Sequence, residues 1–84
     1  MAERQVKVAT EVGLHARPAA VFVQTAAESE DEVGITKDGR RVNAKSILAV
    51  LGLDVRNGDE VSIDSFDAAI VDRLVDLVSP EGES

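Results

Sequence analysis

His15 is the only histidine in a chain of 84 residues, and the residues around it are suited to phosphoryl chemistry. Gly13 lies before it and permits a tight turn, while Arg17 and Pro18 follow it where helical spacing begins. Proline is tolerated in the first turn of a helix, because the amides there have no intrahelical partner. The sequence therefore predicts that His15 is the N-cap of a helix or its immediate neighbour.

The N-terminus of a helix is a position that favours anions. Free N–H groups and the positive end of the helix dipole converge there, and Arg17 would add a fixed charge on a planar fork suited to phosphate. These groups disfavour the charged imidazolium, so we expect His15 to be neutral and nucleophilic near neutral pH. From the residues alone, a surface or capping histidine and a solvated helix arginine remain alternative interpretations.

The rest of the sequence alternates between strand and helix patterns. Strands are expected over 4–10, 32–37, 40–43 and 60–65, with turns at 38–39 and 57–58. Helices are expected from Ala16, over 46–51 with Gly52 as the C-cap, and from the cap Asp67 to Pro80. The apolar face of the first helix is expected to hold Ala19, Phe22, Val23 and Ala26, and that of the last helix Ile70, Leu74, Leu77 and Val78. A competing interpretation makes 53–55 a strand. The order β-α-β-β-α-β-α, with the helices on one sheet face, predicts an open-faced α+β sandwich.

The run Gly13 to Ala19 resembles, residue for residue, the active-site signature of HPr, the histidine-containing phosphocarrier of the bacterial phosphotransferase system. A second segment, Val42 to Leu48 followed by Gly52 and Leu53, also resembles this family and lies at the matching spacing. The chain length is that of one such domain, so the resemblance extends over residues 1–84 as a single domain. It implies a four-stranded antiparallel sheet covered on one face by three helices.

The resemblance also implies a function and the residues that perform it. His15 would accept a phosphoryl group, through Nδ1 in this family, from enzyme I charged by phosphoenolpyruvate, and would donate it to an enzyme IIA domain. Arg17 would position the phosphoryl oxygens, and the backbone amides of Ala16 and Arg17 would stabilise them. Such a protein is a phosphoryl-transfer intermediate in the cytoplasm rather than an independent catalyst.

Ser46 has two interpretations. A serine directly before Ile47 and Leu48 is a good helix N-cap, and capping alone explains its presence. In HPr-like proteins of Gram-positive bacteria a serine in this context is a regulatory phosphorylation site, which would imply an HPr kinase/phosphorylase and a regulator as further partners. A phosphate there would place negative charge on the face expected to bind partners.

The short helix after Ser46 is unusually apolar. Ile47, Leu48 and Leu51 cannot all point inward from one short helix, so we expect some of them, with Ala20, to form an exposed partner-docking patch. In the alternative interpretation, the small core buries them. Phe22 is expected in the core.

Composition excludes several other functions. The net charge of −7 argues against nucleic-acid binding. The absence of cysteine and the single histidine leave no thiolate or zinc site, and no Gly-rich phosphate loop or calcium loop is present, so neither a metal nor a cofactor is expected. No long apolar run predicts membrane insertion, and nothing predicts an oligomer, so a cytoplasmic monomer is expected.

The acidic residues are unevenly distributed. None occurs over 12–27 or 39–53, the stretches that contain Arg17, Arg40, Arg41 and Lys45. If the two stretches meet in space, they would form a neutral-to-basic face suited to a phosphoryl group or acidic partners. Chance clustering in a short chain is the alternative.

Three other functions stay open beside the sugar phosphocarrier. The first is a carrier of the same family in a nitrogen-regulatory or dihydroxyacetone branch. The second is a regulatory binding domain of the same fold, in which His15 is not phosphorylated; the intact motif Gly13 to Ala19 counts against it. The third is a small enzyme acting alone, for which a chain of this size offers little room for a substrate pocket.

Overall fold

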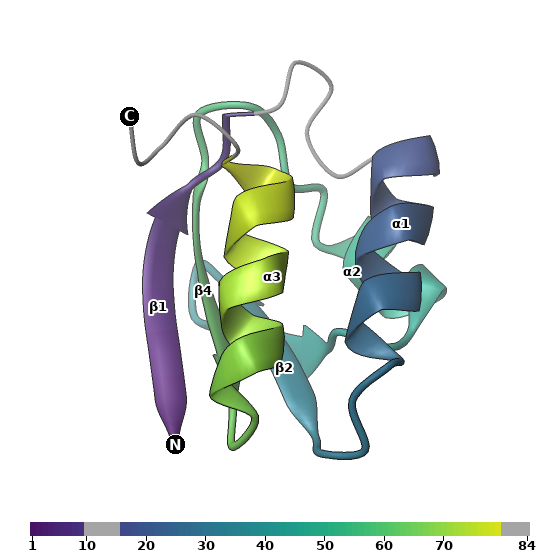
Figure 1. Ribbon diagram of the computed structural model, residues 1–84. Helices are drawn as coiled ribbons and strands as arrows, with labels where there is room; N and C mark the ends of the chain where they lie inside the picture. The colour runs from purple at the N-terminus through teal and green to yellow at the C-terminus, as the bar shows by residue number, and fades with distance from the viewer. Residues whose placement is uncertain (10–15, 80–84) are drawn as a thin grey trace.

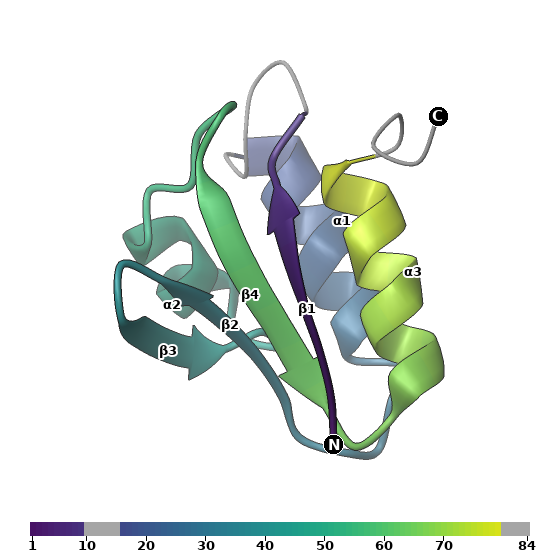
Figure 2. The same ribbon diagram turned by 90° about the vertical axis from the view of Figure 1, so that its left-hand side faces the viewer.

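One antiparallel sheet organises the computed structural model, which describes residues 1–9 and 16–79 and, for Ala16 and Arg17, the backbone alone. Its strands are β1 (Ala2–Lys7), β2 (Val33–Lys37), β3 (Arg40–Asn43) and β4 (Glu60–Ser65), in the sheet order β1-β4-β2-β3. Figure 2 shows this sheet from its uncovered face.

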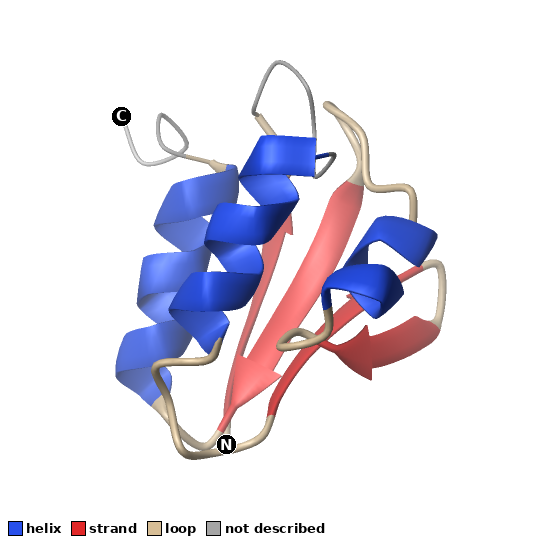
Figure 3. Ribbon diagram, turned by 90° about the vertical axis from the view of Figure 1, so that its right-hand side faces the viewer, coloured by secondary structure: helices blue, strands red, loops and turns tan. Residues whose placement is uncertain are grey.

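Helices α1 (Ala16–Ala26), α2 (Ile47–Gly52) and α3 (Ala68–Val78) cover the other face, as Figures 1 and 3 show. The predicted element order and the open-faced sandwich with helices on one side are therefore confirmed.

The core lies between the sheet and the helices and is almost entirely aliphatic. Phe22 of α1, Ile35 of β2, Ile63 of β4 and Leu74 of α3 have no exposed surface. Strand alternation places Val33 with Ile35, and Val61 with Ile63, on the covered face, as predicted. On α3 the predicted burial of Ile70, Leu74 and Val78 is confirmed. Leu77, which was also predicted on the apolar face, is only half-buried, whereas Val71, which was not, is buried.

The hairpin between β2 and β3 forms as predicted. Asp38 and Gly39 both have positive φ, 53° and 81°, which is the geometry of a two-residue turn that matches strand twist. The flanking residues Lys37 and Arg40 pair in the ladder.

Several predicted boundaries are wrong. The first strand was expected over 4–10, but β1 runs from Ala2 to Lys7, where it pairs with Glu60 at the start of β4, and Thr10 lies outside the described residues. The strand expected over 32–37 begins at Val33, and the helix expected over 46–51 is α2, Ile47–Gly52. Gly52 was expected as the C-cap of α2, but it is the last helical residue, and Leu53 is the cap. Leu53 is only 5% exposed and keeps a helical backbone conformation, so the helix geometry continues past Gly52. The left-handed conformation that was expected at Gly52 is adopted instead by Asp54 (φ 55°). The competing strand over 53–55 is absent from this described segment.

Ser29 connects the three helices by hydrogen bonds. It lies just after α1, and its hydroxyl donates to Asp67 Oδ2 at 2.8 Å, while its carbonyl accepts from Lys45 Nζ at 2.7 Å. Asp67 is the N-cap of α3, as predicted, and its Oδ1 accepts from the amide of Ile70 at 3.2 Å. The pKa of Asp67 is lowered, first by the Ser29 hydroxyl and then by the Ile70 amide, because both donate to the ionised carboxylate.

This contact predicts acid sensitivity. A carboxylate whose folded-state pKa is lowered contributes stability at pH values above its unfolded pKa, about 3.9, and the contribution is lost as the pH falls through the lower folded value. Asp67→Asn keeps an acceptor for the cap but has no charge to lose. We expect urea unfolding to show a smaller loss of unfolding free energy below about pH 4 in Asp67→Asn than in the wild type. The control is Asp76→Asn, which removes an exposed acid of the same helix; parallel acid losses in the wild type and Asp67→Asn would contradict this assignment.

Candidate functional site

α1 begins at Ala16, so His15 directly precedes the first helical residue in the sequence. His15 and Gly13 lie outside the described residues, and so does the Arg17 side chain. The backbone therefore locates the predicted helix N-terminus, whereas the positions of the imidazole and the guanidinium stay predictions. The first turn of α1 contains no acidic residue, so no carboxylate of that turn opposes an anion.

An apolar stripe fixes α1 against the core. Ala19, Phe22 and Ala26 have no exposed surface, which confirms the core position expected for Phe22. Ala20 is half-buried, and Val21, which was not predicted as a surface residue, is 42% exposed. The helical period could have identified Val21, because it falls outside the stripe formed by its buried neighbours.

Ser46 is the N-cap of α2, as predicted. Its backbone is extended (φ −107°, ψ 113°), and its Oγ accepts a hydrogen bond from the amide of Ala49 at 3.3 Å. The hydroxyl is therefore already used by the fold, and its phosphorylation stays a prediction.

Two lysines hold the ends of α2. At the start, Lys45 Nζ binds the carbonyl of Ser29. At the end, Lys37 Nζ donates to the carbonyls of Leu53 at 3.2 Å and Asp54 at 2.7 Å, and it lies 3.0 Å from Asp59 Oδ2. Both lysines are far in sequence from the groups they bind, so local pattern did not indicate these contacts.

α2 carries an exposed apolar patch, which we call the α2 patch and define as Ile47, Leu48 and Leu51. Their side chains are 37%, 80% and 36% exposed, whereas Val50 of the same helix is buried. Because α1 and α2 contact each other, the α2 patch lies on the helix that adjoins the one following His15. Its use as a docking surface stays a prediction.

The predicted neutral-to-basic face is wrong in one respect. The two acid-free stretches do meet, since α1 contacts α2, but Arg41 lies on the uncovered sheet face. Its guanidinium binds Asp64 at 2.9 Å and passes over Gly34, where a Cβ atom would clash with the Arg41 guanidinium. Strand alternation explains the error, because the adjacent Val42 points toward the core side.

Among residues 1–9 and 16–79, no group of three or more histidine, aspartate and glutamate residues is arranged to hold a metal ion. No helix in the same ranges is long and apolar enough to cross a membrane.

Comparison with known proteins identifies the family of this chain. Residues 2–79 match a family model described as the PTS HPr component phosphorylation site. The chain is 49% identical to phosphocarrier protein HPr of Streptomyces coelicolor over 84 residues, covering 94% of this chain and 89% of that protein. It is 46% identical over 63 residues to the HPr-like protein Crh of Bacillus subtilis, covering 75% and 74% of the two chains.

A solved structure gives the same result. The crystal structure of HPr-C-His from Thermoanaerobacter tengcongensis matches with a TM-score of 0.91 at 36% identity, covering 100% of this chain and 98% of that chain. The fold, the position of α1 directly after His15 and the extent of the family match agree, and the chain therefore belongs to the HPr family of phosphocarrier proteins.

Proposed function

We propose that this chain accepts a phosphoryl group on His15 from phospho-enzyme I and donates it to the enzyme IIA domain of a sugar phosphotransferase system, as a monomer in the cytoplasm. The observation that carries the proposal is that the intact run Gly13 to Ala19 places the only histidine directly before α1, in a chain of the HPr family. A family match alone would not assign the reaction to a residue, but a single histidine leaves one imidazole for it.

The chemistry is a transfer between two imidazoles. A nitrogen lone pair of neutral His15 forms a P–N bond as the P–N bond to the donor histidine of enzyme I breaks, and the reverse process delivers the group to the acceptor. The free amides at the start of α1, those of Ala16 and Arg17, would stabilise the phosphoryl oxygens, and the Arg17 guanidinium would position them. No carboxylate in that first turn counteracts them.

The partners would supply the rest of the site. The α2 patch keeps apolar surface in water beside α1, and Ala20 is partly accessible on α1 itself. Exposed apolar patches of this kind are typical of protein-binding surfaces. Enzyme I and enzyme IIA would therefore bind the same region in turn, and each would close the site over His15.

Ser46 is proposed as a regulatory position for an HPr kinase/phosphorylase. It directly precedes the α2 patch, so a phosphate on its Oγ would add charge at the edge of that docking surface. The added charge would oppose the binding of acidic partners.

A regulatory function is the second candidate. The chain is also similar to Crh, and the Bacillus subtilis protein is described as a catabolite repression HPr. Phosphorylation of His15 discriminates between the two candidates, because a purely regulatory binding domain does not need it. Carriage in a nitrogen-regulatory or dihydroxyacetone branch would use the same histidine and would differ in the acceptor.

The first test is phosphoryl transfer from labelled phosphoenolpyruvate through purified enzyme I. We expect the wild type to acquire label that is acid-labile and base-stable, and His15→Ala to acquire none, because phosphoramidates hydrolyse in acid. Circular dichroism of His15→Ala would verify that the variant is folded. Absence of label in the wild type, with enzyme I of the same organism, would contradict the carrier function and favour the regulatory one.

The second test concerns docking. Leu48→Ser removes the most exposed member of the α2 patch, whereas Leu48→Met conserves its apolar surface. We expect Leu48→Ser to slow transfer from enzyme I at subsaturating concentration by about fivefold, because truncation of an interface anchor commonly costs more than about 1 kcal/mol. Leu48→Met should retain most of the rate. Equal rates for the wild type and Leu48→Ser would exclude Leu48 from the docking surface.

The third test separates charge from capping at Ser46. Asparagine and aspartate both cap helices well, but only aspartate adds a charge. We expect Ser46→Asp to slow transfer relative to Ser46→Asn, with the difference shrinking at high salt because ions screen exposed charges. Ser46→Ala should instead lose about 1 kcal/mol of unfolding free energy without slowing transfer. Identical transfer by Ser46→Asp and Ser46→Asn would contradict regulation by charge.

A further inference from the structure

The end of the molecule opposite the start of α1 carries a second apolar surface. Phe66 lies in the turn between β4 and α3 and is 71% exposed, while Met1 is 72% exposed. The β1–β4 ladder pairs Ala2 with Ser65, so Met1 and Phe66 are the next residues beyond its last pair and lie opposite each other. Figures 1 and 2 both show the N-terminus beside this turn.

The fold does not require an aromatic ring in this turn. The turn is held by polar contacts on either side of Phe66: the amide of Asp67 donates to Ser65 Oγ at 3.0 Å, and Asp67 caps α3. The only other phenylalanine, Phe22, has no exposed surface. A small polar residue would meet the geometric needs of the turn, so the exposed ring suggests a role outside the fold.

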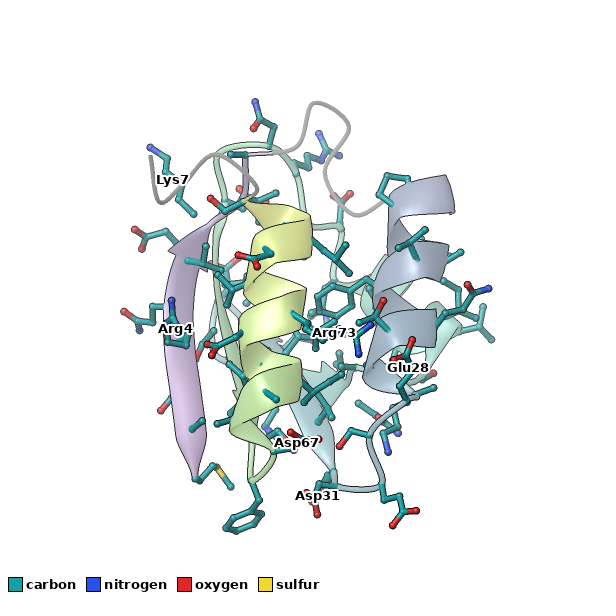
Figure 4. The ribbon with its side chains drawn as sticks, in the orientation of Figure 1. Arg4, Lys7, Glu28, Asp31, Asp67 and Arg73 are labelled. Carbon is teal, nitrogen blue, oxygen red and sulfur yellow. The ribbon has the colours of Figure 1, made fainter. Side chains whose placement is uncertain are left out.

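Acidic side chains border this apolar pair. The hydrogen bond from Ser29 to Asp67 joins the loop after α1 to the turn that contains Phe66, and Glu30 and Asp31 follow Ser29 in that loop. Figure 4 shows Asp31 and Asp67 at the same end of the molecule. Glu30 and Asp31 are exposed and form no salt bridge with any residue in 1–9 or 16–79.

We propose that Met1, Phe66, Glu30 and Asp31 form a docking surface for a protein partner that presents an apolar pocket bordered by lysine or arginine. Aromatic and methionine side chains are enriched at the centres of protein interfaces, and a polar border excludes water around them. The charge decides the class of partner. A second copy of this chain, with its net charge of −7, would place acids against acids, and anionic lipid surfaces and nucleic acids would repel the surface too.

This surface is separate from the site of phosphoryl transfer. The 11 residues of α1 extend about 16 Å, from the start of the helix toward the end of the molecule that carries Phe66. A partner on Phe66 would therefore leave the start of α1 accessible. The proposal does not depend on whether His15 accepts a phosphoryl group.

The experiment begins with a photo-crosslinker, p-benzoylphenylalanine, placed at position 66 of the full chain in cells of the source organism. The same group at position 76, on an exposed part of α3, is the control. The protein crosslinked at position 66 alone is then purified, and its affinity for the unmodified chain is measured by calorimetry. We expect Phe66→Ser and Asp31→Lys each to weaken binding on the order of tenfold or more, and Asp76→Lys to leave it unchanged.

Each other outcome overturns the proposal. These are no crosslink above the control level, a crosslink to a second copy of the chain or to lipid, and a purified partner whose affinity is unaffected by Phe66→Ser or Asp31→Lys. An affinity that does not fall with rising salt would also contradict it, because attraction between exposed charges is screened. Both substitutions lie at exposed positions, and urea unfolding of each variant would verify that the fold is retained.

Discussion

Ser29 is the constraint on which the relative positions of the helices depend. Apolar burial holds each helix against the sheet, but it is non-directional and does not fix how one helix lies beside another. Hydrogen bonds are directional, and Ser29 forms them toward both neighbours: its hydroxyl with the cap of α3 and its carbonyl with Lys45 at the start of α2. At 6% exposure, the serine is shielded from competing water. These hydrogen bonds thereby fix the position of the α2 patch relative to the N-terminus of α1.

Three of the positive charges are engaged in contacts within the fold. Lys37 binds the backbone carbonyls that follow α2, Lys45 binds the carbonyl of Ser29 after α1, and Arg41 lies against Asp64 on the uncovered sheet face. These cations are structural and are not free to attract an acidic partner. The net charge of −7 reflects an excess of carboxylates, while the α2 patch itself is apolar. The proposed recognition by that patch would therefore depend on hydrophobic contact more than on a basic face.

Sequence reasoning succeeded wherever the determinant was local. The hairpin turn at Asp38 and Gly39, the cap at Ser46 and the cap at Asp67 each depend on a few adjacent residues, and all were predicted. It failed where a distant residue decided the outcome. Gly52 has the right chemistry for a helix end, yet the burial of Leu53 and the Lys37 contacts with the following carbonyls moved the cap. The exposed Phe66 was not singled out, because only the sheet register places Met1 beside it.

The two-ended arrangement has a consequence for a phosphocarrier. If His15 carries the phosphoryl group as proposed, donor and acceptor would use the same region around the start of α1, so they would bind in sequence and exclude each other. A partner bound through Phe66 is separated from that region by the length of α1, about 16 Å for its 11 residues, and this exceeds the Debye length of about 8 Å at physiological ionic strength. The charge of a phosphoryl group at the start of α1 is therefore largely screened at that distance. Binding at the Phe66 end would then be insensitive to phosphorylation and would report the amount of the carrier, not its phosphorylation state.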